Sequence, residues 1–485
     1  MIVCNSWGVL MVRFSLWGGA LYAAVFMPEA ALASAGQQHI PGAELSVLWA
    51  VPFACMLLSI AVMPLVLPHL WEKHFGKIAA FWGLAFLAPC LAVYGYSVAL
   101  YEFLHIILLD YMPFLVLLVA LFTVAGGVRL TGSLVGTPLV NTGLLAVGTL
   151  LASCMGTTGA AMLLIRPLLR ANAHRRYRAH SVIFFIFLVA NIGGSLTPLG
   201  DPPLFLGFLK GVDFFWTTTN LLAKTSLLAA TLLAIFFVLD SALFKKEGSP
   251  RPTAQPVETA EKLGLEGWVN LLFLLGIVIA VLLSGLYPLG ELVTISGVAV
   301  EGQNLLRDVA LLCITGLSLR FTSRRCRELN GFSWAPMEEV AKLFLGIFLS
   351  MIPAIAILRA GTEGALAPLI CLVSHDGQPV NSMYFWLAGI LSSFLDNAPT
   401  YLVFFNTAGG DAQRLMHEMP ATLAAISAGA VFMGANSYIG NAPNFMVRSI
   451  AESDGVRMPS FFGYMVWSVG ILVPLFALLT WLFFV

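Results

Sequence analysis

Charged residues are scarce in this chain. Asp, Glu, Lys and Arg make up 10% of its 485 residues, whereas apolar residues make up 59%. Soluble domains carry roughly 25% charged residues, and no soluble fold can bury so large an apolar fraction. The composition therefore excludes a soluble protein and predicts a polytopic membrane protein whose main partner is the lipid bilayer.

An excess of charge of one sign is also missing, because 25 Lys and Arg residues balance 25 Asp and Glu residues. The chain thus lacks the excess of basic residues that is typical of proteins that bind nucleic acids. Its seven cysteines are scattered through apolar runs, and their spacing fits neither a disulfide framework nor a zinc site. A His-Glu-x-x-His motif, which would indicate a metalloprotease, does not occur.

Long apolar runs are abundant, and a helix that spans a membrane needs about 20 apolar residues. Residues 1–35 combine Arg13, an apolar stretch and Ala33-Ser34-Ala35. This pattern is typical of a signal peptide, and a first membrane helix that stays attached is the alternative. Eight further stretches are expected to span the membrane: 45–67, 78–99, 104–128, 221–243, 267–287, 304–321, 341–358 and 460–484.

Basic residues predict the orientation, since loops rich in Lys and Arg stay in the cytoplasm. Arg129 and the arginine cluster that begins at Arg170 fall on the same side, yet residues 131–170 between them are apolar. The simplest path is a re-entrant hairpin with its tip near Gly156-Thr157-Thr158-Gly159. Two full spans with one misassigned basic cluster are the alternative. Non-helical backbone at this depth must be buried in protein or face a watery cavity.

A shift of 240 positions brings two irregular apolar regions into one register. Both contain helix breaks rich in Gly, Pro, Asn and Thr, and the spans on either side align as well. The charge-based topology gives the two halves opposite orientations, which is the architecture of many secondary transporters. The predicted fold is all-α, with two inverted repeats, each with a re-entrant hairpin and a discontinuous transmembrane helix. The predicted parts are a first repeat (45–243), a cytoplasmic linker (244–266) and a second repeat (267–484), with hairpins 131–170 and 381–408 and broken helices 180–212 and 421–452.

Two acids lie in the helix breaks, Asp201 and Asp396. A carboxylate at the centre of a bilayer costs roughly 2.5–3.5 kcal/mol and is functional by default, although capping of a half-helix is an alternative role. We expect the two acids to face each other where the repeats meet and to bind sodium. Neutral side chains in the breaks offer further oxygen ligands, with helix packing or capping as the alternative for each: Thr157, Thr158, Thr197, Asn397, Thr400, Asn436, Ser437, Asn441 and Asn444.

Two of these breaks lie in motifs of a known superfamily. Residues 190–201, which end in Thr197-Pro198-Leu199-Gly200-Asp201, resemble the segment of NhaD-type sodium/proton antiporters that carries a membrane-embedded aspartate. Residues 392–400 resemble the second-half Asp-Asn motif of the same ion transporter superfamily, which also includes arsenite and citrate carriers. With residues 162–167 included, the chain is most similar to the branch named for putative citrate transport, whose members are often labelled sodium:proton antiporters.

The resemblance implies a homodimer in a bacterial inner membrane, with a scaffold part and a transport part that moves as an elevator. It also implies sodium sites at the paired hairpin tips, no enzymatic activity and no cofactor other than the transported Na⁺ and H⁺. One position departs from the antiporter pattern. Their first hairpin carries an Asp-Asn pair, whereas this chain has Gly156-Thr157 there.

Three functions are compared on this basis. In sodium/proton antiport, burial favours the neutral carboxyl group and a bound cation favours the ionised one, so the two ions compete for Asp201 and Asp396. The alternative is sodium- or proton-coupled transport of citrate or another anion, which an acid-free tip at 156–159 would suit. An intramembrane aspartyl protease also uses two aspartates, but the chain has proline-rich, repeated breaks and no Tyr-Asp partner motif.

Overall fold

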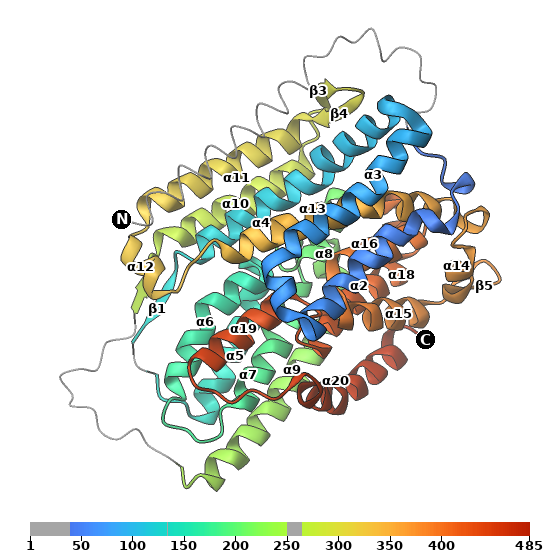
Figure 1. Ribbon diagram of the computed structural model, residues 1–485. Coiled ribbons are helices and arrows are strands. Elements are labelled where there is room, and N and C mark those ends of the chain that lie inside the picture. The colour runs from blue at the N-terminus through green and yellow to red at the C-terminus, as the bar shows by residue number, and fades with distance from the viewer. Residues whose placement is uncertain (1–38, 133, 250–263) are drawn as a thin grey trace.

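Helices account for most of the chain in the computed structural model, which describes residues 39–132, 134–249 and 264–485 (Figure 1). The expected signal peptide or first helix at 1–35 and most of the linker lie outside these residues. The first half contains 3₁₀ turns at Gly42–Glu44 and Val47–Ala50, α2 (Val51–Val66), α3 (Pro68–Ile106), a π-helical turn η4 (Ile107–Tyr111), α4 (Met112–Ala125), β1 (Arg129–Thr131), α5 (Pro138–Met155), α6 (Thr157–Ala171), α7 (Ala179–Leu188), a 3₁₀ turn η5 (Ile192–Ser195), α8 (Pro202–Leu209) and α9 (Trp216–Lys246).

The second half repeats much of this order. It contains β2 (Gly264–Glu266), α10 (Val269–Leu286), β3 (Glu291–Ile295), β4 (Val298–Glu301), α11 (Gly302–Phe321), α12 (Arg324–Leu329), α13 (Ala335–Arg359), a 3₁₀ turn at Gly361–Glu363, α14 (Ala367–Val373), β5 (Ser374–His375), β6 (Gln378–Pro379), α15 (Asn381–Phe394), α16 (Asn397–Thr407), α17 (Ala412–His417), α18 (Pro420–Met433), a 3₁₀ turn η8 (Gly434–Asn436), α19 (Ala442–Ser453) and α20 (Phe461–Phe483).

Seven helical stretches in the described part of the chain are long and apolar enough to cross a membrane, so the prediction of an all-α polytopic membrane protein is confirmed. The boundary expected between 99 and 104 is wrong, because the chain turns at Gly95 instead. Gly95 has φ +84° and ψ 174°, which a residue without a Cβ adopts readily. The span expected at 304–321 corresponds to α11, which is not among the seven; Arg307 and Asp308 reduce its apolar character.

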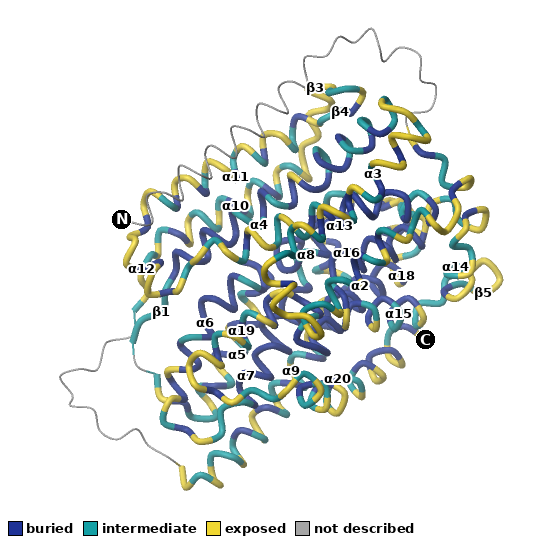
Figure 2. Tube along the Cα trace, viewed as in Figure 1, coloured by how far each residue is buried: buried dark blue, intermediate teal, exposed yellow. Residues whose placement is uncertain are grey.

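The helices form three groups. Helices α4, α10 and α11 pack side by side along one long edge, and α2 and α3 pack against α13 (Figure 1). Helices α5, α6, α7, α9 and α19 form the opposite end. Between these groups lie α8, α16 and α18, which are buried over most of their length (Figure 2). The central group is therefore where the helix breaks of both halves can meet away from lipid.

A two-stranded sheet joins the two halves on the side of the molecule that carries Arg129. β1 pairs antiparallel with β2, with Arg129 opposite Glu266. The two side chains also form an ion pair, with 3.0 Å between Arg129 Nη1 and Glu266 Oε2. The strands have three residues each, too short for a recognisable alternating pattern, and the sequence analysis did not predict them.

A buried ionic network connects α9 to α5, to the start of α7 and to the loop that contains Arg175. The Asp240 carboxylate on α9 accepts hydrogen bonds from Arg175 Nη1 at 2.6 Å, His180 Nε2 at 2.8 Å and Asn141 Nδ2 at 2.9 Å. Arg175 Nε also lies 3.3 Å from a Glu247 carboxylate oxygen. The side chains of Arg175 and Asp240 are fully buried, so each charge depends on the other for compensation.

We expect the Asp240→Asn variant to lower the stability of the folded protein by about 3 kcal/mol. The substitution keeps the shape of the side chain but leaves the Arg175 charge buried without its closest partner, and such losses typically cost about 3–5 kcal/mol. The measurement is the midpoint of thermal unfolding of the purified protein in detergent. Glu338→Gln is the matched control, because Glu338 belongs to an exposed ion pair with Lys342. Equal midpoints for the two variants would contradict the stabilising role of the network.

Candidate ion-binding site

Each half contains two helices that are separated by a very short break. Gly156 alone separates α5 from α6, and its φ of +79° lets the chain turn between them. In the second half, Leu395 and Asp396 separate α15 from α16. The second helix of each pair begins at Thr157 or Asn397, which are 240 positions apart. Both polar residues therefore stand directly after the break within a helical pair.

The second pair of breaks lies between α7 and α8 and between α18 and α19. A 3₁₀ turn follows the first helix in each case, η5 or η8, and an irregular segment follows the turn. Helix α8 begins at Pro202 and α19 at Ala442, again 240 positions apart. Each has Pro in its first turn, where the missing amide hydrogen is not needed. These interruptions lie within residues 180–212 and 421–452, the two ranges for which the sequence analysis expects broken helices.

Equivalent hydrogen bonds hold each break against its helical pair. Thr197 Oγ1 donates to the Ser153 carbonyl, and Ser437 Oγ donates to the Ser393 carbonyl at 2.5 Å. The backbone amides two residues further on donate back to these hydroxyl oxygens at 3.2 Å in both halves. Thr197 and Ser437 thus connect two backbone segments in an equivalent way in the two halves. This is the packing role that was the alternative to ion binding.

The Asp201 carboxylate is the centre at which the breaks meet. It accepts hydrogen bonds from Thr157 Oγ1 at 3.0 Å, from Asn441 Nδ2 at 3.1 Å and from Asn397 Nδ2. These three donors belong to the starts of α6, α19 and α16. Asp201 itself precedes α8 and is 2% exposed. The structure therefore brings four of the sequence-predicted residues, from both halves, into direct contact.

Helix starts add favourable electrostatics around this carboxylate. Helices α6 and α16 begin at Thr157 and Asn397, which both donate to Asp201. Helix α8 begins directly after Asp201, and α19 begins directly after Asn441, the third donor. A helix N-terminus carries about half a positive charge. Asp201 forms no ion pair with Lys, Arg or His in the described part of the chain. Hydrogen bonds and helix dipoles therefore compensate its ionised form.

Asp396 has a different environment. Its side chain accepts a hydrogen bond from the Ala398 amide at 3.0 Å and caps α16, so the capping alternative is realised here. Thr400 Oγ1 donates to the Asp396 carbonyl at 3.0 Å. Asp396 and Asp201 share no hydrogen bond, but Asn397, which donates to Asp201, follows Asp396 directly in the chain. The two acids are close neighbours that do not touch.

A second layer of amides supports the first. Asn444 Nδ2 donates to the Gly434 and Ser437 carbonyls, both at 2.9 Å, and its Oδ1 accepts from Asn191 Nδ2 at 2.7 Å. The Asn191 Oδ1 atom lies 3.3 Å from Asn441 Nδ2. Asn444 thus positions Asn441 through Asn191. The sequence analysis missed Asn191 as a site residue, although an amide inside the apolar run before a break is a visible signal.

Some oxygens in this region have no hydrogen-bond donor. Asn397 Oδ1 and Asn436 Oδ1 are buried and unpartnered, and the half-buried Thr158 hydroxyl makes no hydrogen bond within the described residues. Asn436 Nδ2, by contrast, donates to Ser393 Oγ at 2.9 Å. Free carboxylate, amide and hydroxyl oxygens are ligands suited to hard cations. No group of three or more His, Cys, Asp or Glu side chains that could hold a metal ion occurs in residues 39–132, 134–249 and 264–485.

The chain was compared with known proteins. No curated protein matches it. The family of membrane transporters described as putative citrate transport matches residues 42–484, a range that includes the helices described above and the four breaks. The chain therefore belongs to the putative citrate transport family.

Proposed function

We propose that this membrane transporter exchanges sodium for protons, in a bacterial inner membrane, at a site formed by Asp201 and Asp396. The observation that carries this proposal is the position of the Asp201 carboxylate. It accepts hydrogen bonds from the tips of both helical pairs, through Thr157 and Asn397, and from the opposite break through Asn441. One titratable group thus contacts the starts of three helices, and these helices come from both halves of the chain.

Protonation and sodium binding would change these contacts in different ways. An ionised carboxylate has about four acceptor positions and can serve all three donors. A protonated carboxyl group becomes a donor at one oxygen, so it competes with the amides that now face it. A sodium ion next to Asp201 and Asp396 would use the free oxygens of Asn397 and Thr158 and keep both acids ionised. The two ions would therefore stabilise different arrangements of the same segments.

The relation between the halves supports alternating access. Positions 201 and 441 are equivalent under the 240-residue shift, and their side chains touch at 3.1 Å. Equivalent residues of a duplicated structure can touch only near the axis that relates the copies. We therefore infer inverted repeats that meet at Asp201, the arrangement in which transporters place their sites. In an elevator mechanism, α5–α8, α15, α16, α18 and α19 would move against α2–α4, α10, α11 and α13.

Coupled transport of citrate or another carboxylate is the second candidate. The description of the family favours it, and so do the helix starts around Asp201. The tip at Gly156-Thr157 carries no acid and presents the N-terminus of α6, which suits an anion. In this case Asp201 and Asp396 would bind the coupling cation beside the carboxylate substrate.

Purified protein in sealed liposomes separates the two candidates. A pH-sensitive dye inside acidified vesicles reports proton efflux when sodium is added outside, and labelled citrate uptake is measured in parallel with and without a sodium gradient. The proposal expects proton efflux with sodium and no citrate uptake. Sodium-dependent citrate uptake without proton efflux would replace the first candidate by the second.

The Asp396→Asn variant should lose sodium-triggered proton efflux in the same assay. Asparagine can still cap α16 by accepting the Ala398 hydrogen bond, so the fold should survive, while the charge that binds sodium is gone. We expect a fall of about tenfold or more, since a hydrogen bond or contact to a charged group contributes about 1.5–3 kcal/mol. Asp411→Asn is the control, because Asp411 caps the exposed end of α17 in the same way. Wild-type efflux in Asp396→Asn would remove this acid from the site.

A further inference from the structure

An ion pair links the two sets of helices that would move against each other in the proposed mechanism. The transport group is α5–α8, α15, α16, α18 and α19, and the scaffold group is α2–α4 with η4, α10, α11 and α13. Asp110 belongs to η4, and Lys210 directly follows α8. Lys210 Nζ lies 2.5 Å from Asp110 Oδ1, and the two side chains are only 17% and 4% exposed. The pair therefore joins the transport group to the scaffold group.

Each partner is held within its own group. The hydroxyl of Tyr111, the neighbour of Asp110, donates to the Ala341 carbonyl of α13 at 2.9 Å, which fixes η4 within the scaffold group. The Lys210 amide donates to the Leu206 and Gly207 carbonyls of α8 at 3.1 and 3.0 Å. The backbone of Lys210 is thus part of α8. A movement of one group against the other would therefore separate the two charges.

Separation of these charges is unfavourable. Neither Asp110 nor Lys210 forms a second ion pair within residues 39–132, 134–249 and 264–485. Both side chains are largely buried, and a buried charge that loses its partner is strongly destabilising. The pair therefore stabilises the arrangement in which it is formed over one in which the groups have moved apart.

The pair lies toward the outer face of the membrane. Helix α4 leads from Asp110 to the end at which Arg129 lies. Helix α12 contacts that same end, because Arg327 Nη1 donates to the Thr123 carbonyl at 2.7 Å, and α12 has the sequence Arg-Arg-Cys-Arg-Glu-Leu. Basic segments stay in the cytoplasm. Asp110, at the opposite end of α4, is therefore on the outer side.

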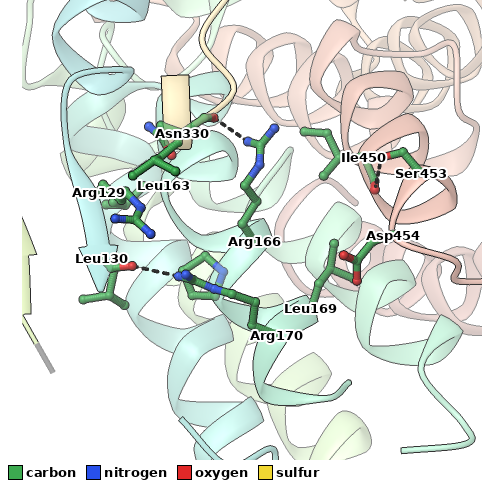
Figure 3. A pocket seen from close by; sticks show the side chains of 12 residues that line it. Arg129, Leu130, Leu163, Arg166, Leu169, Arg170, Asn330, Ile450, Ser453 and Asp454 are labelled. Atoms are coloured by element: carbon green, nitrogen blue, oxygen red, sulfur yellow. Dashed lines mark hydrogen bonds between the residues drawn. The ribbon is translucent and has the colours of Figure 1, made fainter. Parts of the chain in front are cut away.

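The equivalent place toward the cytoplasm has no such pair. Under the 240-residue shift, Ser350 corresponds to Asp110 and Ile450 to Lys210, and neither side chain carries a charge. Ile450 instead lines a cavity of about 230 Å³ that lies between α6 and α19 of the transport group on one side and β1 and the end of α12 on the other (Figure 3). Paired charges thus join the groups toward the outside, whereas a cavity remains between them toward the cytoplasm.

Hydrogen bonds from arginine side chains join the groups on both sides and do not distinguish the two faces. Toward the cytoplasm, Arg166 donates to the Asn330 carbonyl at 2.6 Å and Arg170 to the Leu130 carbonyl at 2.8 Å (Figure 3). Toward the outside, Arg359 Nε donates to Asn406 Oδ1 at 2.8 Å. The feature that is specific to the outer face is therefore the ion pair.

The half-helices α8 and α19 show a matching difference in burial. Phe205 on α8 is 1% exposed, and the Arg307 guanidinium of α11 lies 5.9 Å from the centre of its ring. Phe445, the equivalent residue on α19, is 59% exposed. The half-helix that leads from Asp201 to the outer face is therefore covered by the scaffold group, and its counterpart is uncovered at the same position.

We propose that the ion pair between Asp110 and Lys210 is a lock that holds the outer face of the transporter closed. The lock rests on the proposed movement of the transport group, because that movement opens the pair in every cycle. The structure described here has the lock formed. Its strength sets how often the transport group leaves this position when no ion is bound.

The test measures the distance between the two groups and needs no transported ion. Spin labels are attached to Gln413→Cys on α17, which connects α16 to α18, and to Leu289→Cys, which follows α10, in a chain without its native cysteines. Both positions are exposed. Pulsed electron paramagnetic resonance in lipid nanodiscs should give one dominant distance. Lys210→Gln should raise the population of a second distance at least about tenfold, because it leaves the Asp110 charge buried and unpaired in the locked form.

Two further variants identify the cause of such a shift. Lys342→Gln is the matched control, since Lys342 forms an exposed ion pair with Glu338 within α13, and it should keep the single distance. The exchange Asp110→Lys/Lys210→Asp retains both charges and should restore most of the first distance. An unchanged distribution in Lys210→Gln, or an exchange variant that behaves like Lys210→Gln, would overturn the lock. A lack of sodium-driven proton efflux would leave this result standing, since the labels report position and not transport.

Discussion

Replacing Asp201 by asparagine will reduce ion-driven transport by about 100-fold and leave the helices in place. The new side chain has one acceptor oxygen and an NH₂ group, so it cannot accept from both Asn397 and Asn441 as the carboxylate does. Two hydrogen bonds to a charged group contribute about 3 kcal/mol together, and about 1.4 kcal/mol corresponds to a factor of ten. The measurement is the initial rate of sodium-triggered proton efflux, or of citrate uptake, in liposomes.

The matched control for this experiment is Asp213→Asn. Asp213 lies beyond the end of α8 and is exposed, so its loss removes the same charge from the same half without touching the site. The elution profile and thermal midpoint of both variants should match those of the wild type. Transport by Asp201→Asn at wild-type rates, with either substrate, would contradict the central role of this carboxylate.

Exchanging the residues at positions 201 and 441 should restore part of the lost activity. Asn441→Asp alone places a second carboxylate beside that of Asp201, since Asn441 Nδ2 lies 3.1 Å from Asp201 Oδ1. Two acids this close cannot both ionise, so this variant should also transport poorly. The double variant Asp201→Asn/Asn441→Asp returns the site to a single carboxylate near its original position. We expect it to transport at least about tenfold faster than Asp201→Asn, a coupling of about 1.4 kcal/mol.

The control for the exchange is Asp201→Asn/Asn444→Asp. It restores the charge on the same helix, but Asn444 bonds to Asn191 and to backbone carbonyls and does not contact Asp201. This variant should stay as inactive as Asp201→Asn. Equal rates for the two double variants would show that the position of the charge on α19 has no influence, and the equivalence of 201 and 441 would lose its functional meaning.

The sequence singles out Asp201 and the residues that contact it because its signals are local. Glycine and proline interrupt apolar runs at fixed places, and polar side chains inside those interruptions need partners in a membrane. Asp201, Thr157, Asn397 and Asn441 follow from this reasoning, and the 240-residue register indicates that they come from equivalent breaks. The family match confirms the resemblance to the branch named for putative citrate transport.

The rest of the structure depends on contacts between distant segments. Local sequence shows Asp240 only as a charged residue near the end of a helix. Its burial depends on contacts with Arg175 and His180, about 60 residues away along the chain. Asp110 on the π-helical turn is similarly paired with Lys210, with 2.5 Å between Oδ1 and Nζ, although the two residues lie 100 positions apart in the chain. Local patterns indicate which residues are unusual, but the choice of partner is set by tertiary packing.

The contact between Asp201 and Asn441 also bears on the energy of the two faces of the transporter. Two identical copies would give inward-open and outward-open forms of equal free energy. In the proposed inverted repeats, the equivalent positions 201 and 441 hold a carboxylate in one half and an amide in the other, and the helix starts at Thr157 and Asn397 differ as well. Under that proposal the two open forms differ in free energy, so the unloaded protein should rest with one face open more often than the other.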